Sequence, residues 1–330
     1  MKKIIALILA ATLCLALVCC TPQSSGSDNA KIRIGYLTGP TGMGMAKLIA
    51  DNGGPEGESD KYEFKKYTDS AAAKSDLAAG NIDLICLPTN EAAMYWATVD
   101  KDVKVLAINC LNSLYLITSG EGKVDSLSDL EGGVIYTCKN GTPKVVLQHL
   151  ITKLDLDITI CCEYEGKEIV TPQDLSALVV LGKLPNAVMP EPLITSSLLA
   201  IAKNGDTSIS YSVDVDLADE WAAISDDPIT MGCILADGDF VEANKDKIDS
   251  FLEEYRRSVE YISNPENLDS AANYIFETGV MAAAPAAKKA LANLGSAISY
   301  IDGEDMRWAL INFYCVLNIT LPEDEFYYAK

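Results

Sequence analysis

The segment Ala79–Asn90 reads AGNIDLICLPTN and decides the fold class. Gly80 and Asn81 end an Ala-rich stretch that predicts a helix from residue 70, and the run from Ile82 to Leu87 is apolar at nearly every position. A strand that is apolar on both faces is typical of a buried parallel sheet covered by helices. Pro88-Thr89-Asn90 then opens another predicted helix. The segment therefore predicts helix, strand and helix in succession, which indicates an α/β protein.

The same alternation extends in both directions along the chain. Further strands are expected at 32–37, 62–67, 103–108, 114–118, 134–138, 158–162, 187–189 and 229–235, and helices at 43–50, 142–154, 172–182 and 192–202. From residue 248 to 262 apolar side chains recur every three or four positions, which predicts an amphipathic helix, and helices are also expected near 266–278, 285–295 and 303–317. We expect two doubly wound, mainly parallel sheets flanked by helices.

Composition excludes several classes of function. The 330 residues include 47 Asp and Glu against 26 Lys and Arg, a net charge of −21, which repels a phosphate backbone and makes nucleic acid an unexpected partner. The single histidine, His149, excludes metal centres that need two or more histidines, and we expect no metal and no cofactor. GxSxG, P-loop and GxGxxG motifs are absent, so no catalytic residue is expected.

The N-terminus has the pattern of an export signal. Lys2 and Lys3 precede an apolar run from Ile4 to Val18, too short for a confident membrane span, and the run ends at Cys19-Cys20 before a Ser- and Gly-rich stretch. This resembles a bacterial lipoprotein signal, with residues 1–20 as the signal peptide, Cys20 (or Cys19) as the lipidated residue and 21–30 as a flexible tether. An ordinary signal peptide cut elsewhere is the alternative. The expected location is extracytoplasmic, with a lipid anchor in the cell membrane.

Six segments together resemble the solute-binding proteins of ABC importers. The subgroup that they resemble is the nitrate/sulfonate/taurine type, also called the thiamine-pyrimidine-synthase-like family. The six segments are Ile32–Met45, Ala79–Asn90, Val103–Asn109, Ser126–Tyr136, Asn186–Pro192 and Tyr255–Tyr261. The resemblance implies a two-lobed periplasmic-binding-protein type II fold, acting as a monomer that delivers a small solute to permease subunits. Lobe one would comprise 31–116 and 226–330 and lobe two 117–225, joined by the strands at 114–118 and 229–235. The pyrimidine-synthase branch uses histidine and a cysteine-rich motif that Cys161-Cys162 does not reproduce.

Candidate ligand-binding residues follow the predicted strands, because ligands in open α/β sheets bind beyond the carboxyl ends of strands. The glycines of the first loop would let the backbone approach a ligand, and its hydroxyls could donate. Two prolines hold Glu191 in a stiff loop. A tight turn, a helix cap and a surface carboxylate are the structural alternatives for these positions. The candidates are Thr38, Gly39, Thr41, Gly42, Met43, Thr89, Asn90, Asn109, Asn140, Gly141, Thr142 and Glu191.

Three functions remain open at this stage. The chain could capture a solute for an importer, act as a secreted small-molecule enzyme of lyase type on the same fold, or serve as a ligand-sensing subunit of a membrane receptor. The charge of the solute is also open, since the predicted loops contain Lys139 but no arginine to clamp an anion.

Overall fold

The structure is a computed structural model that describes residues 31–120 and 122–329. Contacts divide the chain into Met1–Lys31 and Ile32–Lys330, and the described residues belong almost wholly to the second unit. The predicted signal peptide, Cys19, Cys20 and the tether lie outside the described residues. In the part of the chain that is described, no helix is both long and apolar enough to cross a lipid bilayer.

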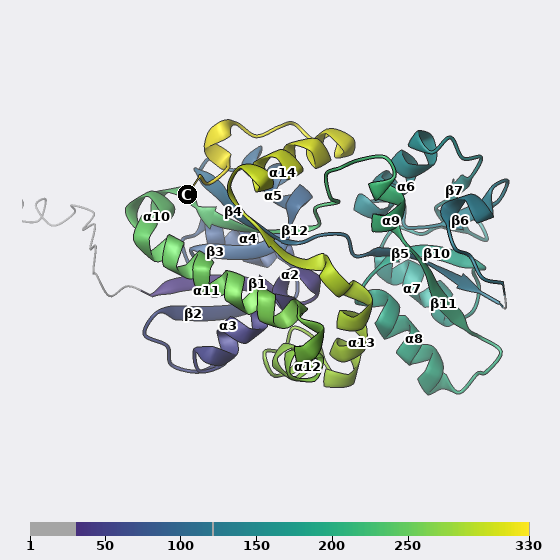
Figure 1. The fold of residues 1–330 in the computed structure, drawn as a ribbon, viewed down its shortest axis with the longest axis horizontal. Coiled ribbons are helices and arrows are strands. Elements are labelled where there is room, and N and C mark those ends of the chain that lie inside the picture. Colours follow the sequence, from purple (N-terminus) through teal and green to yellow (C-terminus); the bar gives the residue numbers. More distant parts are fainter. Residues whose placement is uncertain (1–30, 121, 330) are drawn as a thin grey trace, which may run out of the picture. The chain divides into compact units, whose positions relative to one another are not determined.

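The larger sheet has six strands in the order β13-β4-β12-β3-β1-β2 (Figure 1). Strands β1 to β4 run in one direction, whereas β12 and β13 run antiparallel to their neighbours. Every residue of β4 and β12 is buried, as expected for central strands covered on both faces. The strands are β1 (Ile32–Leu37), β2 (Tyr62–Tyr67), β3 (Leu84–Pro88), β4 (Val103–Cys110), β12 (Gly232–Asp237) and β13 (Ile298–Ile301).

Helices cover both faces of this sheet. One core packs beneath α3 (Ala46–Asp51), α11 (Lys245–Ser263), α12 (Leu268–Glu277) and α13 (Ala284–Leu294). The other packs beneath α4 (Ser70–Ala78), α5 (Thr89–Trp96) and α14 (Gly303–Leu317). The short helices α2 (Pro40–Met43) and α10 (Gly238–Ala243) follow β1 and β12. The amphipathic pattern predicted for 248–262 is confirmed, because its apolar residues form the buried face of α11.

The smaller part of the fold is built around the three-stranded sheet β10-β5-β11. Both neighbours of β5 (Leu114–Ser119) run antiparallel to it, namely β10 (Asn186–Pro190) and β11 (Tyr211–Asp216). The pair β6 (Val134–Tyr136) and β7 (Thr159–Cys161) is parallel, and β8 (Glu163–Tyr164) with β9 (Lys167–Glu168) forms a short hairpin. Four helices surround these strands: α6 (Thr142–Lys153), α7 (Pro172–Val180), α8 (Leu193–Asn204) and α9 (Leu217–Ala222). Short 3₁₀ turns occupy Leu127–Leu130, Pro265–Asn267, Gly295–Ala297 and Asp324–Phe326.

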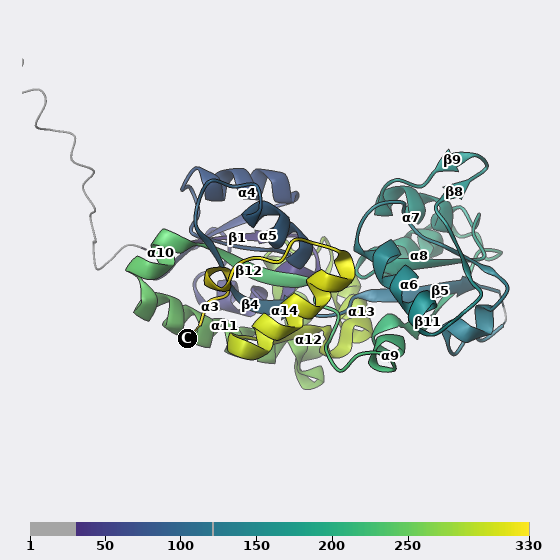
Figure 2. The same cartoon turned by 90° about the horizontal axis from the view of Figure 1, so that it is seen from above.

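The strands expected to join the two lobes each belong to one sheet only. β5 starts within the smaller sheet and β12 lies between β3 and β4 of the larger one. The chain passes between the sheets through the non-helical, non-strand residues 111–113 and 223–231 (Figures 1 and 2). The lobe boundaries at 116/117 and 225/226 stay a prediction.

The last long helix contributes to cores in both parts of the fold. Met306, Leu310 and Tyr314 of α14 pack beneath the larger sheet. Phe313 of the same helix belongs to the core of the smaller part, where its ring meets that of Trp221 at 6.1 Å. The helix therefore ties the two parts together beside the two linkers.

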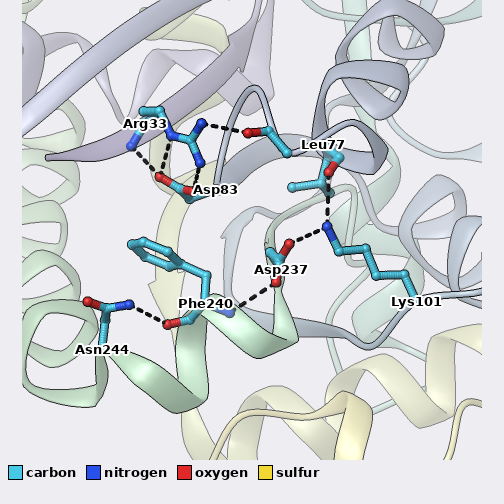
Figure 3. Close-up of polar contacts among 8 residues, drawn as sticks. Arg33, Leu77, Asp83, Lys101, Asp237, Phe240 and Asn244 are labelled. Carbon is cyan, nitrogen blue, oxygen red and sulfur yellow. Dashed lines mark hydrogen bonds and ion pairs between the residues drawn. The ribbon is translucent and has the colours of Figure 1, made fainter. Parts of the chain in front are cut away.

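A polar cluster fastens the amino-terminal edge of the larger sheet (Figure 3). The backbone N–H and Nε of Arg33 donate to Asp83 at 2.8 and 3.0 Å, and another guanidinium nitrogen pairs with the same carboxylate. Asp83 is almost fully buried. Lys101 pairs with Asp237, whose carboxylate also accepts from the backbone N–H of Phe240. The cluster joins the start of β1 to the start of β3 and to the end of β12.

Candidate functional site

A cavity of about 660 Å³ lies at the carboxyl ends of β1 and β3, opposite the edge that holds the Arg33–Asp83 pair. The larger sheet contributes the segments after β1 and β3 and the end of β4, and the smaller part contributes the starts of α6, α7 and α8. The two linkers form part of the wall through Ser113 and Met231. A cavity bounded by both sheets and by the segments that join them is placed where α/β proteins bind small molecules.

Several helices begin at this cavity. α5 and α6 start there without a side-chain cap, so their first-turn N–H groups have no side-chain acceptor. The first turn of α8 is partly satisfied, because the carboxylate of Glu191 accepts from the N–H of Thr195 at 3.1 Å. By contrast, Thr171 caps α7 by accepting from the N–H of Asp174. Free N–H groups at helix starts suit a ligand that carries hydrogen-bond acceptors or negative charge.

The first loop follows β1 and has little freedom. The N–H of Thr38 donates to Tyr67 O at 3.0 Å, and that of Gly39 donates to Val280 O at 3.3 Å. Gly39 has a φ of 98°, which a residue with a side chain rarely adopts. A Cβ at Gly42 would lie 2.0 Å from the carbonyl oxygen of Leu37, so only glycine lets the loop close onto the strand.

Eight of the twelve predicted ligand-binding residues line the cavity. They are Thr38, Gly39, Thr41, Thr89, Asn90, Gly141, Thr142 and Glu191. Thr89 is partly committed within the protein, because its hydroxyl donates to Thr230 O at 2.6 Å.

The other four predicted residues lie elsewhere. Gly42 and Met43 are buried in the short helix α2, and Met43 belongs to the core. Asn109 is buried behind the first loop, where its side-chain amide donates to Thr41 O at 3.1 Å. Asn140 is exposed one residue before Gly141. Gly42, Met43 and Asn140 follow strands in the sequence, but the course of the chain after each strand keeps them out of the cavity lining, and Asn109 belongs to β4 itself.

Glu191 is the most constrained of the lining residues. It is 1% exposed, and its carboxylate accepts from the backbone N–H and the hydroxyl of Thr195 at 3.1 and 2.9 Å. The side-chain amide of Asn293 donates to the same carboxylate. Burial raises the pKa of Glu191 above its usual value, and the donors from Asn293 and Thr195 oppose the rise. Most of its acceptor capacity is used within the protein.

The lining is poor in charge and contains no aromatic ring. The only charged side chains among the lining residues are Glu91 and Glu191, and Glu91 is engaged by Lys74 at 2.6 Å and by Ser70. Leu37, Leu193 and Val280 supply apolar surface. Six prolines stiffen the wall: Pro40, Pro88, Pro143, Pro172, Pro190 and Pro192. The cavity therefore suits a compact, largely aliphatic molecule with a hydrogen-bonding group.

Sequence reasoning missed part of the lining. Gln173 follows the Thr171-Pro172 pair that opens a predicted helix, and this signal could have identified it. Ser196 lies in the first turn and a half of α8, one helical turn after Pro192. The segment Val280–Ala282 comes from a turn between two helices, where no strand end marks it.

Comparison with known proteins identifies the fold. No protein-family model matches the chain, and no curated protein matches it. Among solved structures, an ABC transporter protein from Parabacteroides distasonis is similar with a TM-score of 0.68 and 18% identity, over 91% of this chain and 99% of that one.

Two further structures agree. The periplasmic aliphatic sulphonate-binding protein of Escherichia coli matches with a TM-score of 0.63 and 16% identity, over 90% of this chain and 92% of that one. The ligand-binding component of an ABC-type import system from Staphylococcus aureus, solved with zinc bound, matches with a TM-score of 0.59 and 14% identity, over 90% of this chain and 96% of that one. The predicted two-lobed periplasmic-binding-protein type II fold is thereby confirmed. The mainly parallel sheet predicted for the smaller part is wrong, because both neighbours of β5 run antiparallel to it.

Proposed function

We propose that this chain is the extracytoplasmic solute-binding component of an ABC importer, which captures a small molecule between two lobes and delivers it to a membrane permease. The observation that carries the proposal is the cavity of about 660 Å³ lined from both sheets and from both linkers. A solute that contacts both walls favours the closed arrangement, because only that arrangement offers both sets of contacts. The similar fold of known import-system proteins supports the same role.

The proposed solute is a compact aliphatic molecule that carries an acceptor group such as a carboxylate or a sulfonate. The uncapped starts of α5 and α6 would receive that group through backbone N–H groups. The apolar side chains Leu37, Leu193 and Met231 would cover its carbon skeleton. A flat aromatic heterocycle fits less well, because no lining side chain offers a ring for stacking.

We propose binding without chemical conversion. Neither lining carboxylate is placed as a free acid or base, since Glu91 and Glu191 are both held by neighbouring side chains. We further propose that lobe one comprises 31–116 and 226–330 and that lobe two comprises 117–225. The proposed protein is a monomer that is lipidated at Cys20 or Cys19. Mass spectrometry of the native protein tests the anchor, because a lipid-modified cysteine at the mature N-terminus is expected.

The central test is a thermal-shift screen of the mature chain against aliphatic carboxylates, aliphatic sulfonates, amino acids and aromatic heterocycles. A compound present at about 100 times its Kd should add about 2.7 kcal/mol to the free energy of unfolding. We expect the raised midpoints to fall among the aliphatic acids. Recovery of a chemically altered compound after incubation would favour the enzyme alternative, and no shift across the panel would argue against the proposed function.

A further inference from the structure

Asn293 lies outside the lining of the cavity but contacts it through Glu191. It is the penultimate residue of α13, and its side-chain amide donates to the Glu191 carboxylate. Its backbone carbonyl accepts from the hydroxyl of Tyr115 on β5 at 2.7 Å. One residue therefore binds the wall of the cavity through its side chain and the smaller sheet through its backbone.

Glu191 in turn holds the start of α8 in place. Its backbone N–H donates to Ser113 O in the first linker at 2.8 Å, and its carboxylate holds the N–H and hydroxyl of Thr195. The segment between these two anchors contains Pro192 and Leu193, both of which line the cavity. The orientation of this part of the wall thus depends on the Glu191 carboxylate.

The contact also joins the two parts of the fold. The apolar face of α13, including Ala290 and Leu291, packs in the core of the larger sheet, whereas Glu191 follows β10 of the smaller one. The contact between Asn293 and Glu191 is therefore a partly buried polar contact between a helix of one part and the cavity wall of the other.

We propose that Asn293 is a positioning residue of the solute cavity, which seats the Glu191 carboxylate and through it the first turn of α8. The consequence for solute affinity rests on the proposed function. The structural statement can be tested without any solute.

Asn293 is suited to this role because it is neutral. Two ionisable groups interact with Glu191. Lys289 of α13 carries a positive charge that favours the carboxylate, and Tyr115 of β5 is a neutral phenol, because burial raises its pKa above the usual range. An aspartate at position 293 would face a buried carboxylate, and two carboxylates at hydrogen-bond distance cannot both remain ionised without a strong penalty. The pair would then share a proton, which makes the wall sensitive to pH.

The experiment measures hydrogen exchange of the Glu191 and Thr195 amides in the full mature chain. For Asn293→Asp, we expect protection factors at about pH 8 to fall at least about tenfold below the parent, and the loss to shrink at about pH 5, where one carboxyl binds a proton. The double variant Glu191→Gln/Asn293→Asp exchanges the amide and the carboxylate. The new amide donates to position 293 while its oxygen still accepts from Thr195, so protection should return to within about threefold of the parent.

The matched control is Asn186→Asp, because the amide of Asn186 also donates in a partly buried hydrogen bond, to the carbonyl of Val134 at 2.9 Å, but no hydrogen bond joins it to Glu191. In the double variant Glu191→Gln/Asn186→Asp, the amides of residues 191 and 195 should regain no protection relative to Glu191→Gln alone. Parent-like protection in Asn293→Asp at about pH 8, or a double variant that stays unprotected or unfolded, would overturn the proposal. Neither result depends on the compound screen, so a failure of the proposed function would be seen separately.

Discussion

At the residue scale, the clearest test of the cavity uses one polar side chain from each part of the fold. Asn90 and Thr142 line opposite sides of the cavity and lie in the first turns of α5 and α6. Asn90→Ala and Thr142→Ala should each remove one neutral hydrogen bond to the solute, worth about 0.5–1.5 kcal/mol, so affinity should fall roughly threefold to tenfold. Titration calorimetry with the compound selected by the screen measures the change.

Controls for these two variants come from the far ends of the same two helices. Thr98 and Thr152 donate to backbone carbonyls at 3.0 and 2.8 Å and are exposed away from the cavity. Thr98→Ala and Thr152→Ala should leave affinity unchanged. Equal affinities across all four variants and the parent would place the solute elsewhere.

Glu191 also gives the stability of the fold a defined dependence on pH. Its pKa is raised on folding, chiefly by burial, so the native state holds the proton more tightly than the unfolded chain. This contribution favours folding below the ordinary pKa of a glutamate and is lost as the pH rises through the raised value. Glu191→Gln cannot ionise, so the stability of the parent relative to this variant should decrease as the pH rises.

Urea unfolding of both proteins at about pH 4 and about pH 7.5 checks the direction of this effect. A stability difference that stays constant over this interval would show that Glu191 binds its proton equally well in both states.

At the scale of elements, the two ends of β1 and β3 have different roles: the amino-terminal ends contribute to stability and the carboxyl ends line the cavity. Asp83→Ala removes the partner of Arg33 at the amino-terminal edge of the larger sheet and leaves a guanidinium that had donated to it (Figure 3). We expect a loss of about 1–3 kcal/mol in the free energy of unfolding. Solute affinity should not change, because the cavity lies at the opposite ends of β1 and β3. Chemical denaturation and calorimetry on the same preparation separate the two effects, and a weakened affinity without loss of stability would contradict this division.

The elements also show which parts of the fold the sequence could predict. β3 and β4 are buried on both faces, so their largely apolar sequences identify them as strands. β11 was missed because YSVDVD alternates polar and apolar residues in an acidic stretch and has no continuous apolar run. β13 was missed because four residues between two helices carry too weak a pattern. Both are edge strands, whose pairing depends on partners distant in the sequence.

The residues of the cavity also differ in how far the sequence could predict them. Residues at the ends of parallel strands, such as Thr38 and Asn90, could be identified because the topology brings strand ends together. Asn293 and the Val280–Ala282 turn could not, because they come from α13 and from the turn before it, whose packing onto the rest of the fold is a tertiary event. The direction of a side chain within a loop was equally inaccessible, and Asn109 shows this by pointing behind the first loop.

At the scale of the whole molecule, the ring of Trp221 provides a reporter of movement between the two parts. It is 4% exposed, its indole N–H donates to Asp227 O in the second linker at 2.8 Å, and its ring meets Phe313 of α14. A solute that draws the lobes together should alter these surroundings. In a Trp96→Phe/Trp308→Phe background, we expect the emission of Trp221 to change on titration with the solute, with half of the change reached at the calorimetric Kd. Emission that stays constant while calorimetry registers binding would indicate that the linker does not move.

The position of β12 between β3 and β4 bears on how the protein is made. Its two neighbours belong to the first third of the chain, yet β12 begins only at Gly232. A ribosome that has released the first 220 residues has therefore supplied a sheet with its middle strand missing, and α14, which completes both cores, follows later still. Such late, long-range pairing delays folding. For the exported chain proposed above, this delay would keep the polypeptide unfolded until nearly all of it has been synthesised.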